Sequence, residues 1–190
     1  MTCIVALVQD DVIYVGGDSA AIAGWELCAR ADEKVFLNDE FIIGFCGSFR
    51  TGQLMRYAFL PPERPLQKDE MAFMVTDFVD AIRTCKRDKG SLKKEEESES
   101  HEASLIVGYS GKIYVIEEDF QVGRPVEDYA AIGSGAQIAL GAMFASVSER
   151  DPIKRLTQAL EAAEKFNAGV RGPFVILTLP PGHERKRRKP

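Results

Sequence analysis

The chain begins with Thr2-Cys3-Ile4-Val5-Ala6-Leu7-Val8, an apolar run rich in residues that favour β-strands. Asp10-Asp11 supplies a turn and residues 12–15 form a second apolar run, so the two runs predict a β-hairpin. The N-terminus has no basic segment and its apolar run stops at Gln9, which argues against a signal peptide. We therefore expect this stretch to belong to the fold.

The antiparallel pattern continues after this hairpin. Gly16-Gly17-Asp18-Ser19 ends the second strand with residues that tolerate unusual backbone angles. Residues 34–37 and 41–45 predict another strand pair, joined by a turn at Asn38-Asp39-Glu40. The first part of the chain is therefore predicted to be antiparallel sheet.

Helical periodicity then appears, because Met71, Val75, Phe78 and Ile82 recur at steps of four and three and predict one apolar helix face. Residues 88–102, by contrast, are dense in charge and serine. Such a composition favours an exposed loop.

The second half of the chain repeats this alternation. Residues 105–117 predict a hairpin, and residues 129–132 a strand that leads through Gly133-Ser134-Gly135 into an alanine-rich helix. Asp151-Pro152 starts the last helix as N-cap and first-turn proline, and residues 174–179 form the last strand. Grouped strands and grouped helices favour an α+β layered sandwich over a parallel doubly wound sheet.

Length and composition indicate one globular domain over residues 1–180. Hydrophobic residues make up 45% and charged residues 28% of the chain, as in ordinary globular proteins. The net charge of -5 hides a wholly basic run at residues 185–189, so we expect residues 181–190 to form a flexible basic tail. This tail is either a solvated terminus or a contact for an acidic partner or nucleic acid. No apolar run reaches the ~18 residues that a membrane span needs.

The cysteines are scattered, with no CxxC pair and no histidine nearby, so the sequence predicts no metal site and no cofactor. They are Cys3, Cys28, Cys46 and Cys85, and three of the four lie among apolar or small residues. Reduced, buried thiols of this kind are typical of a cytoplasmic protein.

Histidine is nearly absent, which limits the catalytic chemistry available. His101 lies in the predicted charged loop and His183 in the tail, so a serine–histidine or cysteine–histidine pair has no base. A free α-amino group, with a pKa of roughly 7.7–8.0, can instead accept a proton from the hydroxyl of its own residue. Removal of Met1 would expose Thr2 in this role.

The sequence resembles the proteasome β-subunits, and within them it looks closest to the HslV-type peptidases of bacteria. The segments that carry the resemblance are Thr2-Cys3-Ile4-Val5-Ala6, Gly17-Asp18-Ser19, Glu33-Lys34-Val35, Gly44-Phe45-Cys46-Gly47 and Ile132-Gly133-Ser134-Gly135. Asp18 and Lys34 follow Thr2 at the separations of that family without a gap. The resemblance extends to about Leu179 and implies a four-layer αββα sandwich of the N-terminal-nucleophile hydrolase type.

The resemblance also implies a catalytic role for five residues. The Thr2 hydroxyl would attack a peptide carbonyl while its own amine carries the proton. Lys34 would favour the alkoxide, and Asp18 would keep the Lys34 ammonium charged and oriented. Gly47 N–H would stabilise the oxyanion, or Ser48 would do so if the match to the family has a one-residue gap. Ser134 would position the threonine amine.

The first specificity pocket of the family would, by register, be approached by Ala21, Asp32, Phe36 and Cys46. Asp32 suggests tolerance for basic substrate side chains, but the sequence fits equally well an Asp32 that is only an exposed loop residue.

The sequence departs from the family where an Asp-x-x-Ser-Gly arrangement usually supports the threonine. Here that region reads Lys165-Phe166-Asn167-Ala168-Gly169, so the support is missing or rebuilt and Lys165 reverses the expected charge. The cation site of some bacterial relatives is not recognisable there either.

Three functions remain open at this stage. The leading one is a threonine peptidase that hydrolyses unfolded polypeptide inside a homo-oligomeric ring, with an ATP-dependent unfoldase as partner. The second, suggested by the altered Lys165–Gly169 region, is a catalytically inactive structural or assembly protein. The third is an amidase of the same fold that acts on a small amide.

Overall fold

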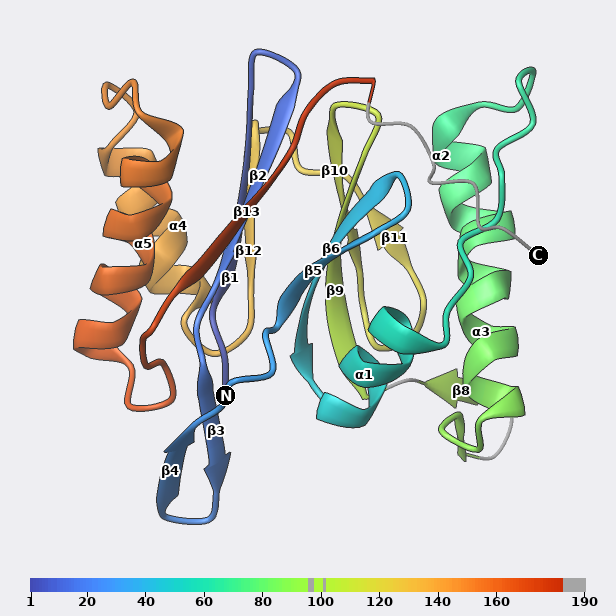
Figure 1. Cartoon of the computed structure of the whole chain (residues 1–190), viewed down its shortest axis with the longest axis horizontal. Helices are drawn as coiled ribbons and strands as arrows, with labels where there is room; N and C mark the ends of the chain where they lie inside the picture. Colours follow the sequence, from blue (N-terminus) through green and yellow to red (C-terminus); the bar gives the residue numbers. More distant parts are fainter. Residues whose placement is uncertain (96–97, 101, 183–190) are drawn as a thin grey trace.

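The computed structural model describes residues 1–95, 98–100 and 102–182. Two sheets stack face to face, and helices cover the outer face of each one (Figure 1). The helices on the outer face of the first sheet are α4 (Ala136–Ala145) and α5 (Pro152–Phe166). Those on the second are α1 (Phe49–Tyr57), α2 (Glu70–Phe73), the π-helical turn η1 (Met74–Phe78) and α3 (Val79–Asp88). The expected αββα sandwich is therefore present.

The first sheet has the strand order β12-β1-β2-β13 and is antiparallel throughout. Its strands are β1 (Ile4–Gln9), β2 (Val12–Gly17), β12 (Tyr129–Ile132) and β13 (Val175–Leu179). Asp10 and Asp11 join β1 to β2 with φ values of 53° and 61°. Two positive φ angles are what a tight two-residue hairpin turn requires, so the predicted hairpin is confirmed.

The second sheet has the strand order β11-β10-β9-β6-β5. Its strands are β5 (Val35–Asn38), β6 (Phe41–Gly47), β9 (Ala103–Tyr109), β10 (Lys112–Ile116) and β11 (Val122–Gly123). Strands β5 and β6 pair, as do β9 and β10, in agreement with the two hairpins predicted from the sequence.

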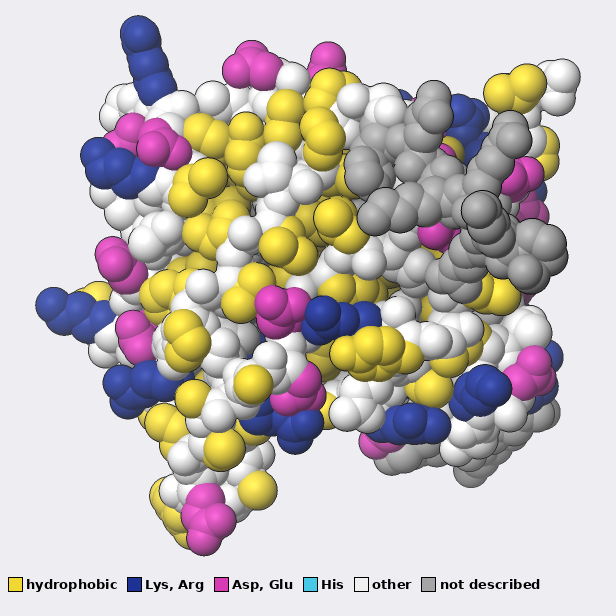
Figure 2. Space-filling model, in the orientation of Figure 1, with side chains coloured by type: hydrophobic (Ala, Val, Ile, Leu, Met, Phe, Trp, Pro, Cys, Tyr) yellow, Lys and Arg dark blue, Asp and Glu magenta, His cyan; other side chains and the backbone are white. Residues whose placement is uncertain are grey.

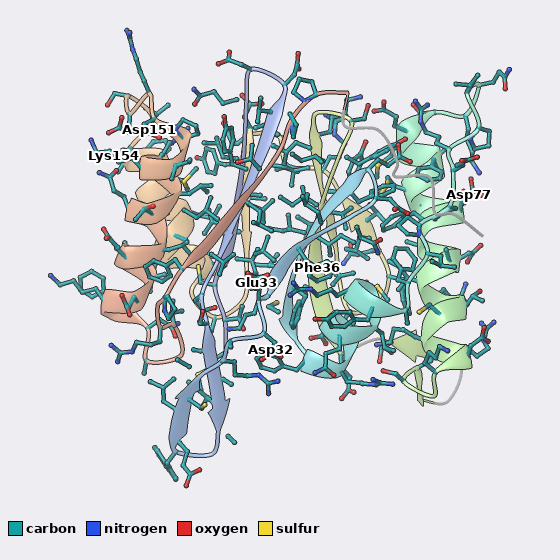
Figure 3. All side chains as sticks on the ribbon, in the orientation of Figure 1. Asp32, Glu33, Phe36, Asp77, Asp151 and Lys154 are labelled. Carbon is teal, nitrogen blue, oxygen red and sulfur yellow. The ribbon has the colours of Figure 1, made fainter. Side chains whose placement is uncertain are left out.

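Strand β1 is buried on both faces, which explains its uninterrupted apolar sequence. Ile4 and Ala6 belong to the core between the sheets, whereas Val5 and Leu7 pack against α4 and α5. The same alternation operates in β5, where Phe36 lies on the helix-covered side of its sheet, in the core with α1 and α3 (Figure 3).

The predicted apolar helix face is interrupted by η1. Phe78 and Ile82 are buried as expected, but Val75 is 46% exposed while Met74 is buried. Val75 lies within this π-helical turn, whose repeat is wider than 3.6 residues, so a pattern based on 3.6 residues per turn places it wrongly.

Two short hairpins lie outside the main sheets. Strands β3 (Ala20–Ala23) and β4 (Glu26–Ala29) form one that projects from the sandwich, with apolar side chains along it (Figure 2). Strands β7 (Lys93–Glu95) and β8 (Ser98–Ser100) form the other within the predicted loop at residues 88–102. That region is therefore not all loop, because backbone pairing needs no apolar side chains. Residues 96, 97 and 101, and the predicted tail from 183, lie outside the described residues.

Candidate active site

Thr2, Asp18 and Lys34 come from three separate points of the chain and meet at one end of the two sheets. Strands β1 and β2 pair with Ile4 opposite Gly17, so Asp18 N–H donates to the Cys3 carbonyl at 3.2 Å. Gly17 also lets the sheets approach closely, because a Cβ there would lie 2.8 Å from both Ile4 and Val35 side-chain atoms. Lys34, next to Val35, is thereby placed beside Thr2.

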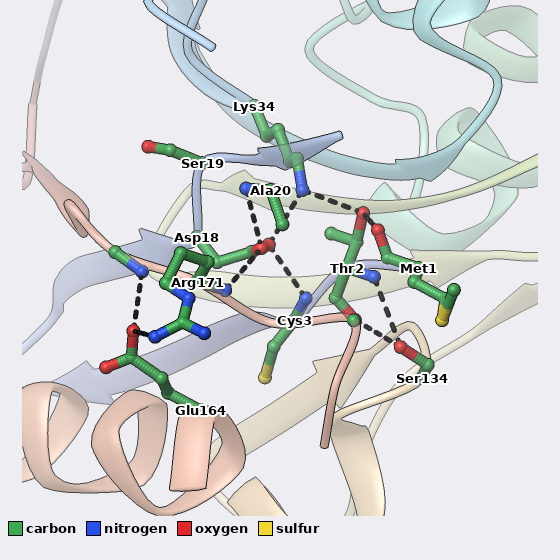
Figure 4. Close-up of polar contacts among 12 residues, drawn as sticks. Met1, Thr2, Cys3, Asp18, Ser19, Ala20, Lys34, Ser134, Glu164 and Arg171 are labelled. Carbon is green, nitrogen blue, oxygen red and sulfur yellow. Dashed lines mark hydrogen bonds and ion pairs between the residues drawn. The ribbon is translucent and has the colours of Figure 1, made fainter. Parts of the chain in front are cut away.

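The Lys34 ammonium bridges the other two side chains (Figure 4). Its Nζ lies 2.8 Å from Asp18 Oδ1 and 3.0 Å from Thr2 Oγ1. The Lys34 and Asp18 side chains are 1% and 0% exposed, and Thr2 is 3% exposed. Burial lowers the pKa of Lys34, and the negative charge of Asp18 opposes that shift. The Thr2 hydroxyl is thus held against a buried ion pair.

Asp18 is also held by the backbone. Its Oδ1 accepts from Cys3 N–H at 3.0 Å, and its Oδ2 accepts from Ala20 N–H at 3.0 Å and Arg171 N–H at 3.3 Å. A buried carboxylate requires partners of this kind, because it has lost the water that would otherwise solvate it. These contacts fix the direction in which Asp18 faces Lys34.

The backbone of Thr2 is positioned by the turn between β12 and α4. Thr2 N–H donates to Ser134 Oγ at 3.2 Å, and Gly135 N–H donates to the Thr2 carbonyl at 3.2 Å. Gly133 has φ +93°, and a Cβ there would lie 2.3 Å from the Thr2 carbonyl oxygen. Only glycine therefore fits at the centre of this turn.

Asn167 joins this turn from the end of α5, which the sequence did not predict. Its Nδ2 donates to the Ser134 carbonyl at 2.7 Å, and its Oδ1 accepts from Gly169 N–H at 2.8 Å. Ser134 Oγ lies 3.4 Å from the same Oδ1. Asparagine just after a helix is an ordinary capping pattern, so no local signal distinguishes this one.

Of the two residues expected to stabilise an oxyanion, Gly47 ends β6 with φ +92°. Ser48 N–H donates to the Glu102 carbonyl at 3.0 Å, and Ser48 Oγ accepts from Thr51 N–H as the N-cap of α1. Because its N–H already has a partner, Ser48 is the weaker candidate.

The four residues expected to line a substrate pocket are not all together. Ala21 and Cys46 are both partly exposed; Ala21 follows Ala20, whose N–H donates to Asp18, and Cys46 packs beside Gly133. Asp32 is partly exposed, but Arg30 binds both of its carboxylate oxygens at 2.6 Å and holds the pKa of that carboxyl below its usual value. Phe36 is 2% exposed in the helix-side core and so faces away from Thr2. A different register of β5 would be needed to bring it there.

The remaining chemical features concern cysteines, metals and membranes. All four cysteines are free thiols, and Cys28 is exposed whereas Cys3 is buried. Among residues 1–95, 98–100 and 102–182, no group of three or more His, Cys, Asp or Glu side chains could hold a metal ion. No helix in the same ranges is both long and apolar enough to cross a membrane.

No protein-family model matches the sequence, but solved structures match the fold over nearly its whole length. Thiobacillus denitrificans BPH in complex with epoxomicin has 20% identity and a TM-score of 0.77, and the match covers 95% of this chain and 100% of that one. The HslV of Trypanosoma brucei has 20% identity and a TM-score of 0.67, covering 94% and 99%. Anbu (ancestral beta-subunit) of Yersinia bercovieri has 16% identity and a TM-score of 0.65, covering 94% and 82%. The chain therefore has the fold of the proteasome-type N-terminal-nucleophile hydrolases.

Proposed function

We propose that this chain is a threonine peptidase in which the Thr2 hydroxyl attacks the peptide bond once Met1 has been removed. The contact of Lys34 Nζ with both Thr2 Oγ1 and Asp18 Oδ1 is the observation that carries the proposal. A cation 3.0 Å from a hydroxyl favours its alkoxide, and at so low an exposure its charge is weakly screened.

In this mechanism the free Thr2 amine takes the hydroxyl proton as Oγ1 bonds to the substrate carbonyl carbon. The Gly47 N–H stabilises the negative charge that develops on the carbonyl oxygen. The amine then returns the proton to the leaving nitrogen, which leaves an ester on Thr2. Water, deprotonated by the same amine, hydrolyses that ester and restores the hydroxyl.

Met1 must leave before this chemistry is available. While Met1 is attached, the Thr2 nitrogen belongs to a peptide bond and is not a base, and Thr2 Oγ1 donates to the Met1 carbonyl. Met1 is 59% exposed, with its side chain packed against Gly169, whereas Thr2 is only 3% exposed. An aminopeptidase that removes initiator methionine accepts small second residues such as threonine.

The decisive experiment combines intact-mass measurement with an epoxyketone probe such as epoxomicin. We expect a chain that lacks Met1, gains one probe molecule on Thr2 and cleaves peptides. Thr2→Ala should abolish both adduct and cleavage, whereas Thr178→Ala, which removes an exposed hydroxyl from β13, should change neither. Retained Met1 with no adduct would favour the inactive structural protein, and an adduct without cleavage of any peptide would favour the small-amide amidase.

We also propose that the chain associates with copies of itself to form the ring. Large exposed apolar side chains include Trp25 at the tip of the β3–β4 hairpin, which is 103% exposed, and Phe144 and Val147 at and just after the end of α4, which are 76% and 74% exposed. Exposed apolar side chains that form a contiguous patch are typical of protein–protein contacts. Sedimentation should give a mass well above the 21.0 kDa of one chain. A monomeric mass would contradict the ring, and without a ring there is no enclosed compartment for an unfoldase to feed.

A further inference from the structure

Asn167 lies in the Lys165–Gly169 region, and its side chain connects three parts of the structure. It follows the last residue of α5, contacts the β12–α4 turn through Ser134, and contacts the chain beyond the helix through Gly169. Ser134 in turn accepts a hydrogen bond from the Thr2 nitrogen. Asn167 therefore lies two hydrogen bonds away from the group that would act as base.

The chemistry of these contacts requires an amide at this position. The Ser134 carbonyl only accepts, and the Gly169 N–H only donates, so they fix which end of the amide faces each. A carboxylate would place one of its oxygens about 2.7 Å from the Ser134 carbonyl oxygen, where no proton would lie between them. Asparagine is thus matched to this backbone, and aspartate is not.

The same amide influences the direction of the Ser134 hydroxyl. Its single hydrogen can point to Asn167 Oδ1 or to the Thr2 carbonyl, each 3.4 Å from Ser134 Oγ. In both cases a lone pair of Ser134 Oγ faces the Thr2 nitrogen, at 3.2 Å. An amine that donates one hydrogen to Ser134 has its lone pair directed away from Ser134. This lone pair is the one that accepts the proton of Thr2 Oγ1, which belongs to the same residue.

We propose that Asn167 is a positioning residue that orients the Thr2 amine through Ser134, and that as a neutral amide it adds no negative charge beside this amine. The inference rests on the proposed function, because it concerns the amine that forms when Met1 is removed. It identifies the altered Lys165–Gly169 region as a rebuilt support. The amine then needs no carboxylate from α5 to hold it.

The first test measures the amine directly and does not depend on catalysis. A chain that starts at Thr2 is prepared by cleavage of a removable leader, with 15N-labelled threonine, and the pKa of the amine is read from its 15N chemical shift. Asn167→Asp should raise that pKa by about one unit, because a negative charge placed two hydrogen bonds from the amine stabilises the ammonium form. Gln158→Glu is the matched control, since it adds the same charge on an exposed site of α5, nine residues earlier.

The second test asks whether Asn167 acts through Ser134. Asn167→Ala should lower kcat about tenfold and leave KM unchanged, because a misplaced base lowers the rate without affecting substrate binding. The double variant Ser134→Ala/Asn167→Ala should be no slower than Ser134→Ala alone, within about twofold. Thermal unfolding of every variant shows whether it is folded, and Asn167→Ala supplies an uncharged alternative if Asn167→Asp does not fold.

The outcomes separate the inference from the proposed function. An amine pKa that is equal in Asn167→Asp and Gln158→Glu overturns the inference, and so do additive losses of rate in the double variant. If the pKa moves as expected but no chain cleaves peptide or reacts with the probe, the inference about the amine stands and the proposed peptidase fails.

Discussion

The buried pair of Asp18 and Lys34 makes a quantitative prediction about stability. With 2.8 Å between Lys34 Nζ and Asp18 Oδ1, their attraction is about 6 kcal/mol at an effective dielectric constant of about 20. Much of this offsets the loss of hydration, so the pair adds little net stability. Removal of one partner is different, because it leaves a buried charge without its counter-ion and costs about 3–5 kcal/mol.

The two single substitutions should not cost the same. Lys34→Met leaves Asp18 with its three backbone N–H donors, so we expect a loss near 3 kcal/mol in the free energy of unfolding. Asp18→Asn leaves the Lys34 ammonium with the Thr2 hydroxyl but without its counter-ion. The backbone N–H groups contact both carboxylate oxygens, so whichever side the amide NH2 takes, it faces an N–H group that needs an acceptor. We therefore expect about 4–5 kcal/mol for that change.

The double variant Asp18→Asn/Lys34→Met tests the reasoning most sharply. It removes both charges, so its loss should be no greater than that of Asp18→Asn alone, which corresponds to a coupling free energy of at least about 3 kcal/mol. The assay is urea unfolding followed by far-UV circular dichroism at pH 7, with all variants at one protein concentration and in the same state at Met1. Losses below about 1 kcal/mol for the single variants, or losses that add in the double variant, would refute the account of a buried, mutually dependent pair.

Two further predictions follow from other residues. Lys86 is 1% exposed and burial lowers its pKa to about 8, so the folded chain binds its proton less tightly than the unfolded chain, whose pKa is 10.5. Between pH 8 and 10.5 the wild type should gain stability relative to Lys86→Met, by about 1–3 kcal/mol, and parallel pH profiles in urea unfolding would contradict this. Gly133→Ala should lower the stability by more than about 2 kcal/mol, since its Cβ would lie 2.3 Å from the Thr2 carbonyl oxygen, while Gly141→Ala in α4, with open space around it, should raise stability by about 0.5–1 kcal/mol. Equal melting temperatures for these two variants would contradict the steric explanation.

Prediction from the sequence worked best where structure depends on neighbours in the chain. A few adjacent residues determine both the β1–β2 hairpin and the N-cap of α5 at Asp151. The β3–β4 hairpin was not predicted, because its strands are only four residues long and show no alternation of apolar and polar residues on either side of Gly24-Trp25. Val75 was placed on the wrong face since a π-helical turn changes the repeat without a local sequence signal.

The sequence by itself determined which chemistry to propose, because the near absence of histidine and the residue types and order of Thr2, Asp18 and Lys34 can be read without a structure. The tertiary structure alone decided which of the expected residues meet. Phe36 faces the helix-side core because side chains alternate along β5, and Asn167 reaches Ser134 because α5 ends beside the β12–α4 turn. Contacts between residues 33 positions apart depend on how helices and sheets pack, and packing is a property of the whole chain that no local pattern contains.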